Sequence, residues 1–365
     1  MKSEKFIASH LEPGTNGFGL LRLFAAIAVV YSHAWGIVGG NEAFEPLEAQ
    51  TGFSLGWHAV NLFFALSGIL IAESLSRRSS YFAFGWARIL RIYPALIVVT
   101  AGVYLIALTL TGAVDWRLSD SFMYVVRNAM LVGGGVTLPG VFADNPIPGE
   151  INTPLWTIKF EVMAYASVAA LCFLSQMTSN RLSLKSFSLA IVIVTGLVMM
   201  TFDREEMHSY FGHALRFAFT FYLGVLAWSF KDQIRPRLIT LALIFSVNVF
   251  LLANNVGFAP AQIILVAYGA LYLGTLGTNA LTRFTDRQDY SYGVYIIGFP
   301  VQQTVMLVSG ITDPLMNFFV SILIALPLAA VCWNFIEKPA LKFKKYRLHT
   351  SNLTEKRSWF LKSNV

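Results

Sequence analysis

The sequence predicts an all-α, polytopic transmembrane helical bundle, and three observations carry this prediction. Of the 365 residues, 56% are hydrophobic, and the mean hydropathy is +0.60. Only 13% are charged, whereas soluble chains carry about 25% charged residues. The apolar residues gather in runs of about 20, which is the length that an α-helix needs to cross the hydrocarbon core of a bilayer.

Scanning the chain for such runs predicts about ten membrane-spanning helices. They are expected near residues 17–38, 57–76, 92–112, 154–175, 187–202, 214–230, 237–254, 259–277, 290–309 and 314–335. The run 17–38 follows Lys2 and Lys5 as a signal peptide would, but it is too long and lacks a convincing small-residue cleavage site. We therefore interpret it as a retained first helix.

The distribution of basic residues predicts how these helices are oriented. Cytoplasmic loops carry an excess of Lys and Arg, and with the N-terminus inside, about 21 of the 27 basic residues fall on the cytoplasmic side. Both termini are therefore expected in the cytoplasm. Residues 1–340 form the predicted transmembrane domain, and residues 341–365 a basic cytoplasmic tail that lies on anionic membrane lipid.

Composition also argues against several other classes of protein. The net charge is +7, but the basic residues are scattered between apolar runs, so no nucleic-acid partner is expected. Cys172 and Cys332 lie in apolar runs, which argues against a disulfide framework and leaves the redox compartment open. No metal site is expected, because His208 and His213 lack the i, i+4 spacing of a helical zinc pair and no cysteine accompanies them.

Two ionisable side chains, Arg22 and His33, lie within the first predicted helix. At about 100° per residue they project from the same face, and about 16 Å separates them along the helix axis. Taken alone, Arg22 fits snorkelling to the lipid headgroups, and His33 fits an interhelical hydrogen bond. A functional role for the pair therefore depends on the rest of the chain.

A series of motifs follows this Arg-x10-His pair. They are NLFFALSGILI at Asn61 to Ile71, ARILRIYP at Ala87 to Pro94, TPLWTIKFEVMAY at Thr153 to Tyr165, YSYGVYIIGFPVQQ at Tyr290 to Gln303 and FIEKP at Phe335 to Pro339. In these motifs and their order, the chain resembles the acyltransferase 3 family of integral-membrane sugar O-acyltransferases. One position departs from the family pattern: many members have His two residues before the Pro of the fourth motif, where this chain has Gly298.

The resemblance implies a multi-pass O-acyltransferase, usually an O-acetyltransferase, of the bacterial inner membrane. It implies that acyl-CoA, usually acetyl-CoA, is the cytoplasmic donor substrate and that no cofactor is bound permanently. The acceptor is then a hydroxyl of a cell-surface or exported carbohydrate, such as lipopolysaccharide, exopolysaccharide or a lipid-linked oligosaccharide.

Three arginines, Arg22, Arg88 and Arg91, are the expected binding residues for acyl-CoA. All three lie at the predicted inner boundary of the membrane, where the phosphates of coenzyme A would arrive. Arginine binds phosphate with charge-assisted and often bidentate hydrogen bonds. Ordinary positive-inside charge is the alternative explanation for Arg88 and Arg91.

His33 and Glu161 are the expected catalytic residues. A neutral imidazole suits removal of a proton from the acceptor hydroxyl at neutral pH, and a covalent acyl-His or acyl-Ser intermediate is the competing mechanism. Glu161 is costly inside an apolar span, so a partner or a cavity is expected beside it. Its role is either to orient His33 or bind the sugar, or to form an ion pair with Lys159 or a cation of another helix.

Ser67, Trp156 and Tyr165 are the expected substrate-binding residues. Ser67 could assist the hydroxyl, although Ser beside Gly is common at packed membrane helices. Tyr165 shares a helix face with Glu161, four residues earlier. Trp156 could stack on a sugar ring, although aromatic belts also place Trp near the membrane surface.

Two other classes of function stay open at this point. In a polytopic transporter, Arg22, His33 and Glu161 would line a path for substrate or protons. A catalytically inert relative would serve as an interaction protein, and Gly298 keeps this possibility open. The intact Arg22 and His33 favour the enzyme.

Overall fold

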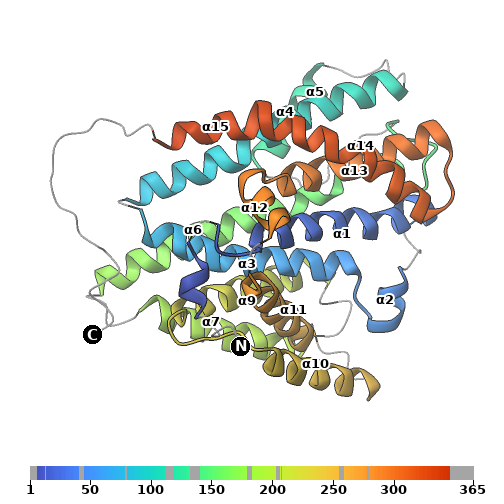
Figure 1. Ribbon diagram of the computed structural model, residues 1–365. Helices are drawn as coiled ribbons and strands as arrows, with labels where there is room; N and C mark the ends of the chain where they lie inside the picture. The colour runs from blue at the N-terminus through green and yellow to red at the C-terminus, as the bar shows by residue number, and fades with distance from the viewer. Residues whose placement is uncertain are drawn as a thin grey trace.

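The computed structural model describes residues 6–12, 14–40, 45–78, 80–111, 118–131, 140–178, 183–202, 206, 208–254, 259–277 and 279–345. Within these ranges the regular elements are all helices and no strand forms, which confirms the predicted all-α class (Figure 1). Most of the predicted basic tail, from residue 346 to residue 365, lies outside the described residues.

The helices follow one another along the chain as η1 (Ile7–His10), α1 (Phe18–Gly39), α2 (Pro46–Thr51), α3 (Leu55–Ser76), α4 (Tyr81–Thr111), α5 (Leu118–Ala129), η2 (Thr153–Thr157), α6 (Ile158–Met177), α7 (Leu184–Met199), α9 (Tyr210–Ser229), α10 (Leu238–Ala253), α11 (Ala259–Thr275), α12 (Ala280–Arg287), α13 (Ser291–Ser309), α14 (Pro314–Cys332), η3 (Trp333–Glu337), α15 (Lys338–Lys342) and η4 (Phe343–Lys345). Each of the ten predicted runs overlaps a separate long helix. Among these elements, η3 is a π-helical segment that continues α14.

Length and apolar composition identify fewer spans than the ten that we predicted. Among the described residues, five helical segments are long and apolar enough to cross a membrane, namely Phe18–Gly39, Leu55–Ser76, Tyr81–Ile106, Thr153–Met177 and Pro314–Lys342. A sixth would result if α11 and α12, which meet at a 107° bend, count as one broken span. The count of ten and the cytoplasmic termini therefore stay predictions.

Contacts between helices give their relative directions. Residues of α3 meet residues about 155 to 159 positions later in α9, from Asn61 with Thr220 at one end to Glu73 with Trp228 at the other, so these two helices are parallel. By contrast, α14 returns antiparallel to α13, since Asn317 donates to the Gln302 carbonyl near the turn that joins them. These directions are those of a chain that crosses a membrane alternately.

The tightest approach between helices joins α3 and α9. A Cβ atom on Gly68 would lie 2.0 Å from the Phe221 carbonyl oxygen, and one on Gly224 would lie 2.1 Å from the Ala65 carbonyl oxygen. Only glycine permits this approach, because two backbones touch where a side chain would stand. Serine side chains begin both helices, since Ser54 and Ser209 each accept a hydrogen bond from a backbone N–H of the first turn.

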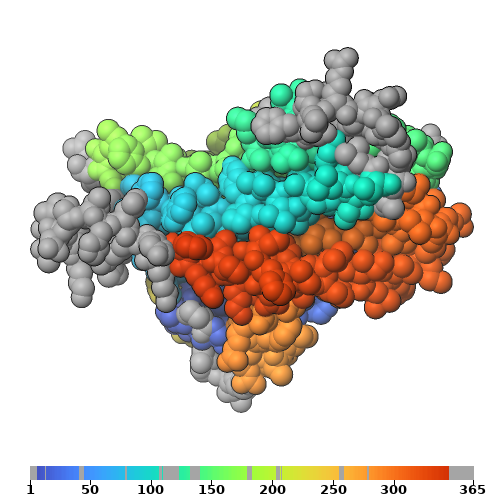
Figure 2. Space-filling view, turned by 90° about the horizontal axis from the view of Figure 1, so that it is seen from above, coloured from blue at the N-terminus to red at the C-terminus, as the bar shows by residue number. Residues whose placement is uncertain are grey.

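The helices surround α1 and α3, which run through the middle of the molecule (Figure 1). In that view α4, α13 and α14 lie on one side, and α7, α9, α10 and α11 lie on the other. Figure 2 shows α4 beside the C-terminal helices. The contacts of α4 there include residues of η3 and α15. Both cysteines, Cys172 and Cys332, are buried and unpaired, as expected for packing residues.

Candidate active site

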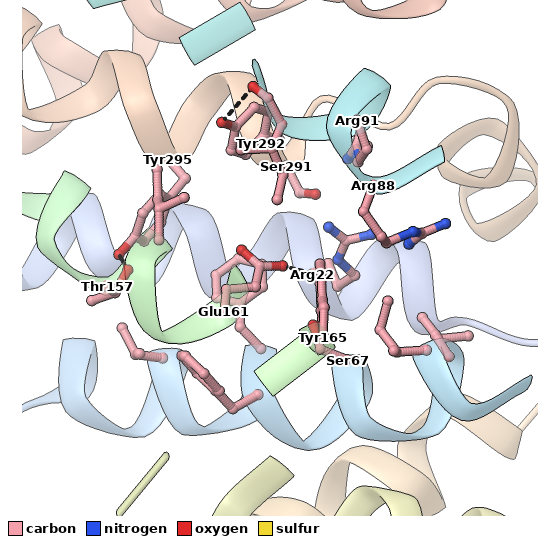
Figure 3. A pocket seen from close by; sticks show the side chains of 17 residues that line it. Arg22, Ser67, Arg88, Arg91, Thr157, Glu161, Tyr165, Ser291, Tyr292 and Tyr295 are labelled. Carbon is pink, nitrogen blue, oxygen red and sulfur yellow. Dashed lines mark hydrogen bonds between the residues drawn. The ribbon is translucent and has the colours of Figure 1, made fainter. Parts of the chain in front are cut away.

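A pocket opens between the central helices and is lined by residues of α1, α3, α4, η2, α6 and α13. Its empty space is about 860 Å³, which includes space open to solvent. The lining consists of Arg22, Val60, Phe63, Phe64, Ser67, Leu70, Ile71, Arg88, Arg91, Ile92, Thr157, Ile158, Glu161, Tyr165, Ser291, Tyr292 and Tyr295. Figure 3 shows the three arginines at one end and Thr157 with Tyr295 at the other.

Six of the eight site residues expected from the sequence line this pocket. They are Arg22, Ser67, Arg88, Arg91, Glu161 and Tyr165. They come from four helices that lie far apart in the sequence. The fold therefore brings together side chains from separate motifs. His33 and Trp156 are not among the lining residues.

Asp289 organises the arginine end of the pocket. Its Oδ2 atom accepts from Arg22 Nη1 at 3.1 Å and from Arg91 Nη2 at 2.6 Å, and its Oδ1 atom accepts from the Ser291 hydroxyl at 2.5 Å. Burial raises the pKa of Asp289, but Arg22 and Arg91 outweigh burial and hold the pKa at about 2. Asp289 is therefore an anion at any physiological pH.

Arg91 is held from a second side by Glu337. Its Nη1 atom donates to Glu337 Oε2 at 2.6 Å, and its guanidinium lies over the Trp333 ring at 5.7 Å. Both partners belong to the π-helical η3, whose wider turn places residues four apart against one guanidinium. Two carboxylates of the protein therefore neutralise the charge of Arg91. These ion pairs hold α4 against η3 and the start of α13.

Arg88 differs from the other two arginines in its partners. It donates to the Ser74 hydroxyl at 3.4 Å and lies over the rings of Phe84 and Tyr165, at 5.8 and 5.9 Å. Its buried Nε atom has no hydrogen-bond partner, and no carboxylate in the described part of the chain forms an ion pair with it. Of the three arginines, Arg88 is the one without a carboxylate partner among the described residues.

Lys344, in η4, adds a fourth basic group near this end of the pocket. Burial lowers the pKa of Lys344 to about 7, and the positive charges of Arg88, Arg91 and Arg78 contribute in the same direction. Sequence reasoning placed this lysine in a tail on the lipid surface. The structure instead brings it into the field of the pocket arginines, and a phosphate group arriving there would favour its charged form.

Glu161 and Tyr165 form a pair within the pocket. They lie one helical turn apart in α6, and the Tyr165 hydroxyl donates to Glu161 Oε1. The predicted shared face is therefore present, and the predicted cavity lies beside Glu161 (Figure 3). No ion pair between Lys159 and a described carboxylate forms, since Lys159 lies over the rings of Tyr210 and Phe160.

His33 lies beyond the far end of the pocket. At that end, the Tyr295 and Thr157 hydroxyls are 2.6 Å apart. One helical turn further along α13, about 6 Å away, Phe299 packs edge-on against the His33 ring at 5.4 Å. His33 therefore lies outside the lining but close to its end, on the opposite side from the arginines.

Trp156 packs within an aromatic cluster instead of the pocket. Its ring lies 4.5 Å from His213, 5.6 Å from Phe217 and 5.8 Å from Phe160. Trp156 is not among the pocket-lining residues, and its sugar-stacking role stays a prediction. Its neighbour Thr157 does line the pocket, so η2 connects the cluster with the pocket wall.

Gly298, at the position where many family members have His, has a packing role. A Cβ atom there would lie 2.4 Å from Val30 Cγ2, so the side chain of Val30 occupies the space that a residue at 298 would need. Because valine is branched at Cβ, it cannot swing aside easily. The chain thus uses this position to bring α13 against α1.

Several residues that shape the site were missed by sequence reasoning, namely Asp289, Lys344, Thr157, Ser291, Tyr292 and Tyr295. The spacing of Tyr292 and Tyr295 within the fourth motif was the one available signal, because residues three apart share a helix face. Within the described ranges, no group of three or more His, Cys, Asp or Glu side chains is placed to hold a metal ion.

Comparison with known proteins places this site in a family. The family model described as an acyltransferase domain matches residues 15–334. An O-acetyl transferase of Shigella phage Sf6 is 26% identical over 89% of this chain and 95% of its own length. Nodulation protein 10 of Rhizobium leguminosarum bv. viciae is 26% identical over 92% of this chain and 95% of its own length.

Two further comparisons complete the picture. Acyltransferase MdmB of Streptomyces mycarofaciens is 31% identical, over 40% of this chain and 36% of its own length. No solved structure matches this chain significantly. Because the family model spans nearly the whole chain and includes all the pocket residues, the transporter interpretation is not favoured. The chain belongs to the acyltransferase 3 family and is a membrane acyltransferase with O-acetyltransferase relatives.

Proposed function

We propose that this protein transfers an acetyl or other acyl group from cytoplasmic acyl-CoA to a hydroxyl of a cell-surface or exported glycan. The observation that carries the proposal is the polarity of the pocket. It has a cluster of arginines at one end, near the start of α1, and hydroxyl groups at the other end, towards His33. Such a pocket suits a donor and an acceptor that arrive from opposite sides of a membrane.

The arginine end is the proposed site for the phosphates of coenzyme A. Arg88 has no described carboxylate partner that would compete with a phosphate oxygen, whereas Arg22 shares Asp289 with Arg91. In this proposal Arg88 makes the main contact, Arg22 contributes a second one, and Arg91 acts mainly by holding the other two in position. Lys344 adds positive charge from the tail side.

The reaction is a direct acyl transfer. His33 removes the proton from the acceptor hydroxyl, whose oxygen forms a bond to the thioester carbonyl carbon. The carbon–sulfur bond then breaks, and coenzyme A leaves as a thiolate that takes the proton back from His33. The carbonyl carbon has to travel beyond Tyr295 to meet His33, and the long arm of coenzyme A allows this, since Arg22 and His33 are about 16 Å apart along α1.

Glu161 contributes to catalysis from within the pocket. Its carboxylate lies between the arginine end and Tyr295, with one oxygen held by Tyr165 (Figure 3). We propose that its negative charge orients the acceptor hydroxyl or the protonated His33 during transfer. Ser67, on the opposite wall in α3, is the proposed hydrogen-bonding partner of the substrate.

Mass spectrometry of extracted surface polysaccharide tests this function. Cells that produce wild type, His33→Ala, Arg88→Ala or Arg283→Ala are compared at equal protein levels. Arg283 is an exposed arginine of α12 outside the pocket, so its variant serves as the matched control. A defined acyl mass on the glycan should be lost in the first two variants, because each lacks a group that the reaction needs, and retained in the control.

Two results would contradict the proposal in different ways. If a deletion strain and wild type carried the same acyl groups on every extracted glycan, glycan transfer would be wrong for that host. If His33→Ala retained the acyl mass while Arg88→Ala lost it, transfer would hold and the general base would have to be sought in the pocket, where Glu161 is the described carboxylate.

A further inference from the structure

A second cluster of basic groups lies between α3 and α9, next to the pocket. Arg216, in the second turn of α9, is its centre and is only 3% exposed. Its guanidinium lies over the rings of Phe217 at 4.4 Å and Trp57 at 5.2 Å. His58 and His213 each experience its positive charge, so the fold brings three basic side chains together.

Each side chain of this cluster has a buried polar atom without a partner, although Asn61 Oδ1 accepts from the Thr220 hydroxyl at 3.4 Å. Buried atoms without a hydrogen bond include Arg216 Nε, His58 Nδ1, His213 Nδ1 and Asn61 Nδ2. No carboxylate within the described ranges forms an ion pair with Arg216. The aromatic rings compensate only part of the cost, because a cation between rings is still a charge removed from water without a counter-charge.

Arg91 has ion-pair partners that Arg216 lacks. The Arg91 side chain is 13% exposed, and it still meets two carboxylates at 2.6 Å. Arg216 is 3% exposed and meets no carboxylate among the described residues. Burying an unpaired guanidinium lowers the stability of the free protein. A negatively charged group of a ligand would supply the missing partner, so ligand binding would offset that cost.

The cluster borders the hydroxyl end of the pocket. Phe217 stacks on Phe64, a lining residue, with 4.1 Å between ring centroids. Arg216 also interacts electrostatically with Tyr295, another lining residue. A ligand that reaches Thr157 and Tyr295 from the side of His33 is therefore one residue layer from Arg216. The arginines proposed to bind coenzyme A lie at the opposite end (Figure 3).

We infer that the cluster of Arg216, His58, His213 and Asn61 binds an anionic oxygen group, a carboxylate or a phosphate, carried by the acceptor sugar. This inference rests on the proposed function and narrows its acceptor to an acidic glycan or a sugar phosphate. The guanidinium supplies the charge and a planar pair of donors, and Asn61 supplies a neutral donor. The rings of Trp57 and Trp156 border the cluster, since Trp57 lies 5.2 Å from the Arg216 guanidinium and Trp156 lies 4.5 Å from the His213 ring.

Binding to purified full-length protein in detergent tests the inference without relying on turnover. Thermal unfolding is followed with galacturonate, galactose 6-phosphate, galactose, inorganic phosphate or acetyl-CoA. Galacturonate or galactose 6-phosphate should raise the midpoint by about 5 °C at one hundred times its Kd, whereas galactose should not. The two acidic sugars separate a carboxylate from a phosphate, and inorganic phosphate shows whether the sugar is needed.

Arg216→Met and Arg216→Lys are the decisive variants, with Arg283→Met as the matched control. For Arg216→Met, the Kd for the acidic sugar should rise about ten- to hundred-fold, as expected when a charged hydrogen-bonding group is lost. For Arg216→Lys, part of the affinity should remain. Without ligand, Arg216→Met should unfold at the same temperature as wild type or higher, because an unpaired buried charge has been removed.

The outcomes distinguish this inference from the function on which it rests. Stabilisation by acetyl-CoA without any by the acidic sugars would overturn the anionic subsite and leave the donor site intact. A lack of response to acetyl-CoA in wild type would contradict the transferase proposal itself. A marked fall in the unfolding temperature of ligand-free Arg216→Met would identify a structural cation and would also overturn the subsite.

Discussion

Asp289 shows how much a single side chain can organise at the residue scale. It is the common acceptor of two arginines from different helices, and it lies in the short connection between α12 and α13. If this carboxylate lost its charge, the two arginines would be affected differently. Arg22 would lose its described ion-pair partner, while Arg91 would keep Glu337.

We expect Asp289→Asn to lower the free energy of unfolding by about 1–3 kcal/mol. This is less than the cost of breaking a fully buried ion pair, because the side chains of Asp289 and Arg22 are 21% and 22% exposed. The pKa of Asp289 is about 2, below the ordinary value of 3.8. Its contribution is therefore complete above the ordinary pKa and is lost only as the pH falls towards 2. Thermal unfolding in detergent should accordingly give a difference from wild type that persists from about pH 5 to about pH 9.

Asp286→Asn is the matched control for that experiment. Asp286 is exposed on α12, and no described basic residue forms an ion pair with it. Burial and the negative charge of Asp289 raise the pKa of Asp286, so its removal should be neutral or slightly stabilising. Equal losses in the two variants would mean that Asp289 acts through general charge and not through its arginines.

At the scale of elements, the contact between α3 and α9 positions both proposed binding regions. Along one face α3 carries Ser67 into the pocket, and near its start it carries His58 and Asn61 into the Arg216 cluster. The two helices hold this register because Gly68 and Gly224 let their backbones touch. A shift of either helix would disturb the donor pocket and the acceptor region together.

Replacing Gly68 by Ala should therefore destabilise the protein by about 1–3 kcal/mol or more, the usual range for overpacking. The new methyl would meet a backbone carbonyl oxygen at 2.0 Å, and backbone cannot rotate away as a side chain can. Gly85→Ala in α4 is the control. Nothing lies within 4 Å of a Cβ atom there, and alanine favours a helix by about 1 kcal/mol over glycine.

Both variants are measured by thermal unfolding and by the yield of folded protein after size-exclusion chromatography. Gly68→Ala should unfold at a lower temperature than wild type, and Gly85→Ala at the same or a higher temperature. Indistinguishable curves for Gly68→Ala and wild type would show that α9 can move away from α3 at little cost, and the close contact would lose its assigned role.

At the scale of the whole molecule, the open question is how the bundle sits in the membrane. Parallel and antiparallel contacts agree with alternate crossings, and the positive-inside rule predicts that the connection between α9 and α10 lies in the cytoplasm. The connection between α13 and α14 is then outside. The native cysteines are buried, so they give little background in a labelling experiment.

Single cysteines at two exposed positions test this orientation. Thr312→Cys, between α13 and α14, should react with a membrane-impermeant maleimide in intact spheroplasts. Asp232→Cys, between α9 and α10, should react only after the membrane is permeabilised. The reverse pattern would place the N-terminus outside, and it would exchange the sides assigned to donor and acceptor.

The sequence by itself determined the class of the fold, the positions of ten long helices and the family. Apolar runs of helical length depend on local composition, and motifs such as TPLWTIKFEVMAY are continuous in the chain, so both can be recognised without coordinates. Six of the eight expected site residues also lie in one pocket. Each of the six stood out as a polar group in an apolar span or within a motif.

Only the tertiary structure decided which groups meet. Arg91 pairs with residues 198 and 246 positions later in the chain, and no local spacing predicts such partners. The same is true of Val30 against Gly298 and of the Arg216 cluster, in which α3 and α9 contribute side chains about 159 positions apart. Whether a buried charge is paired depends on how helices pack, and packing brings together residues that the linear chain keeps far apart.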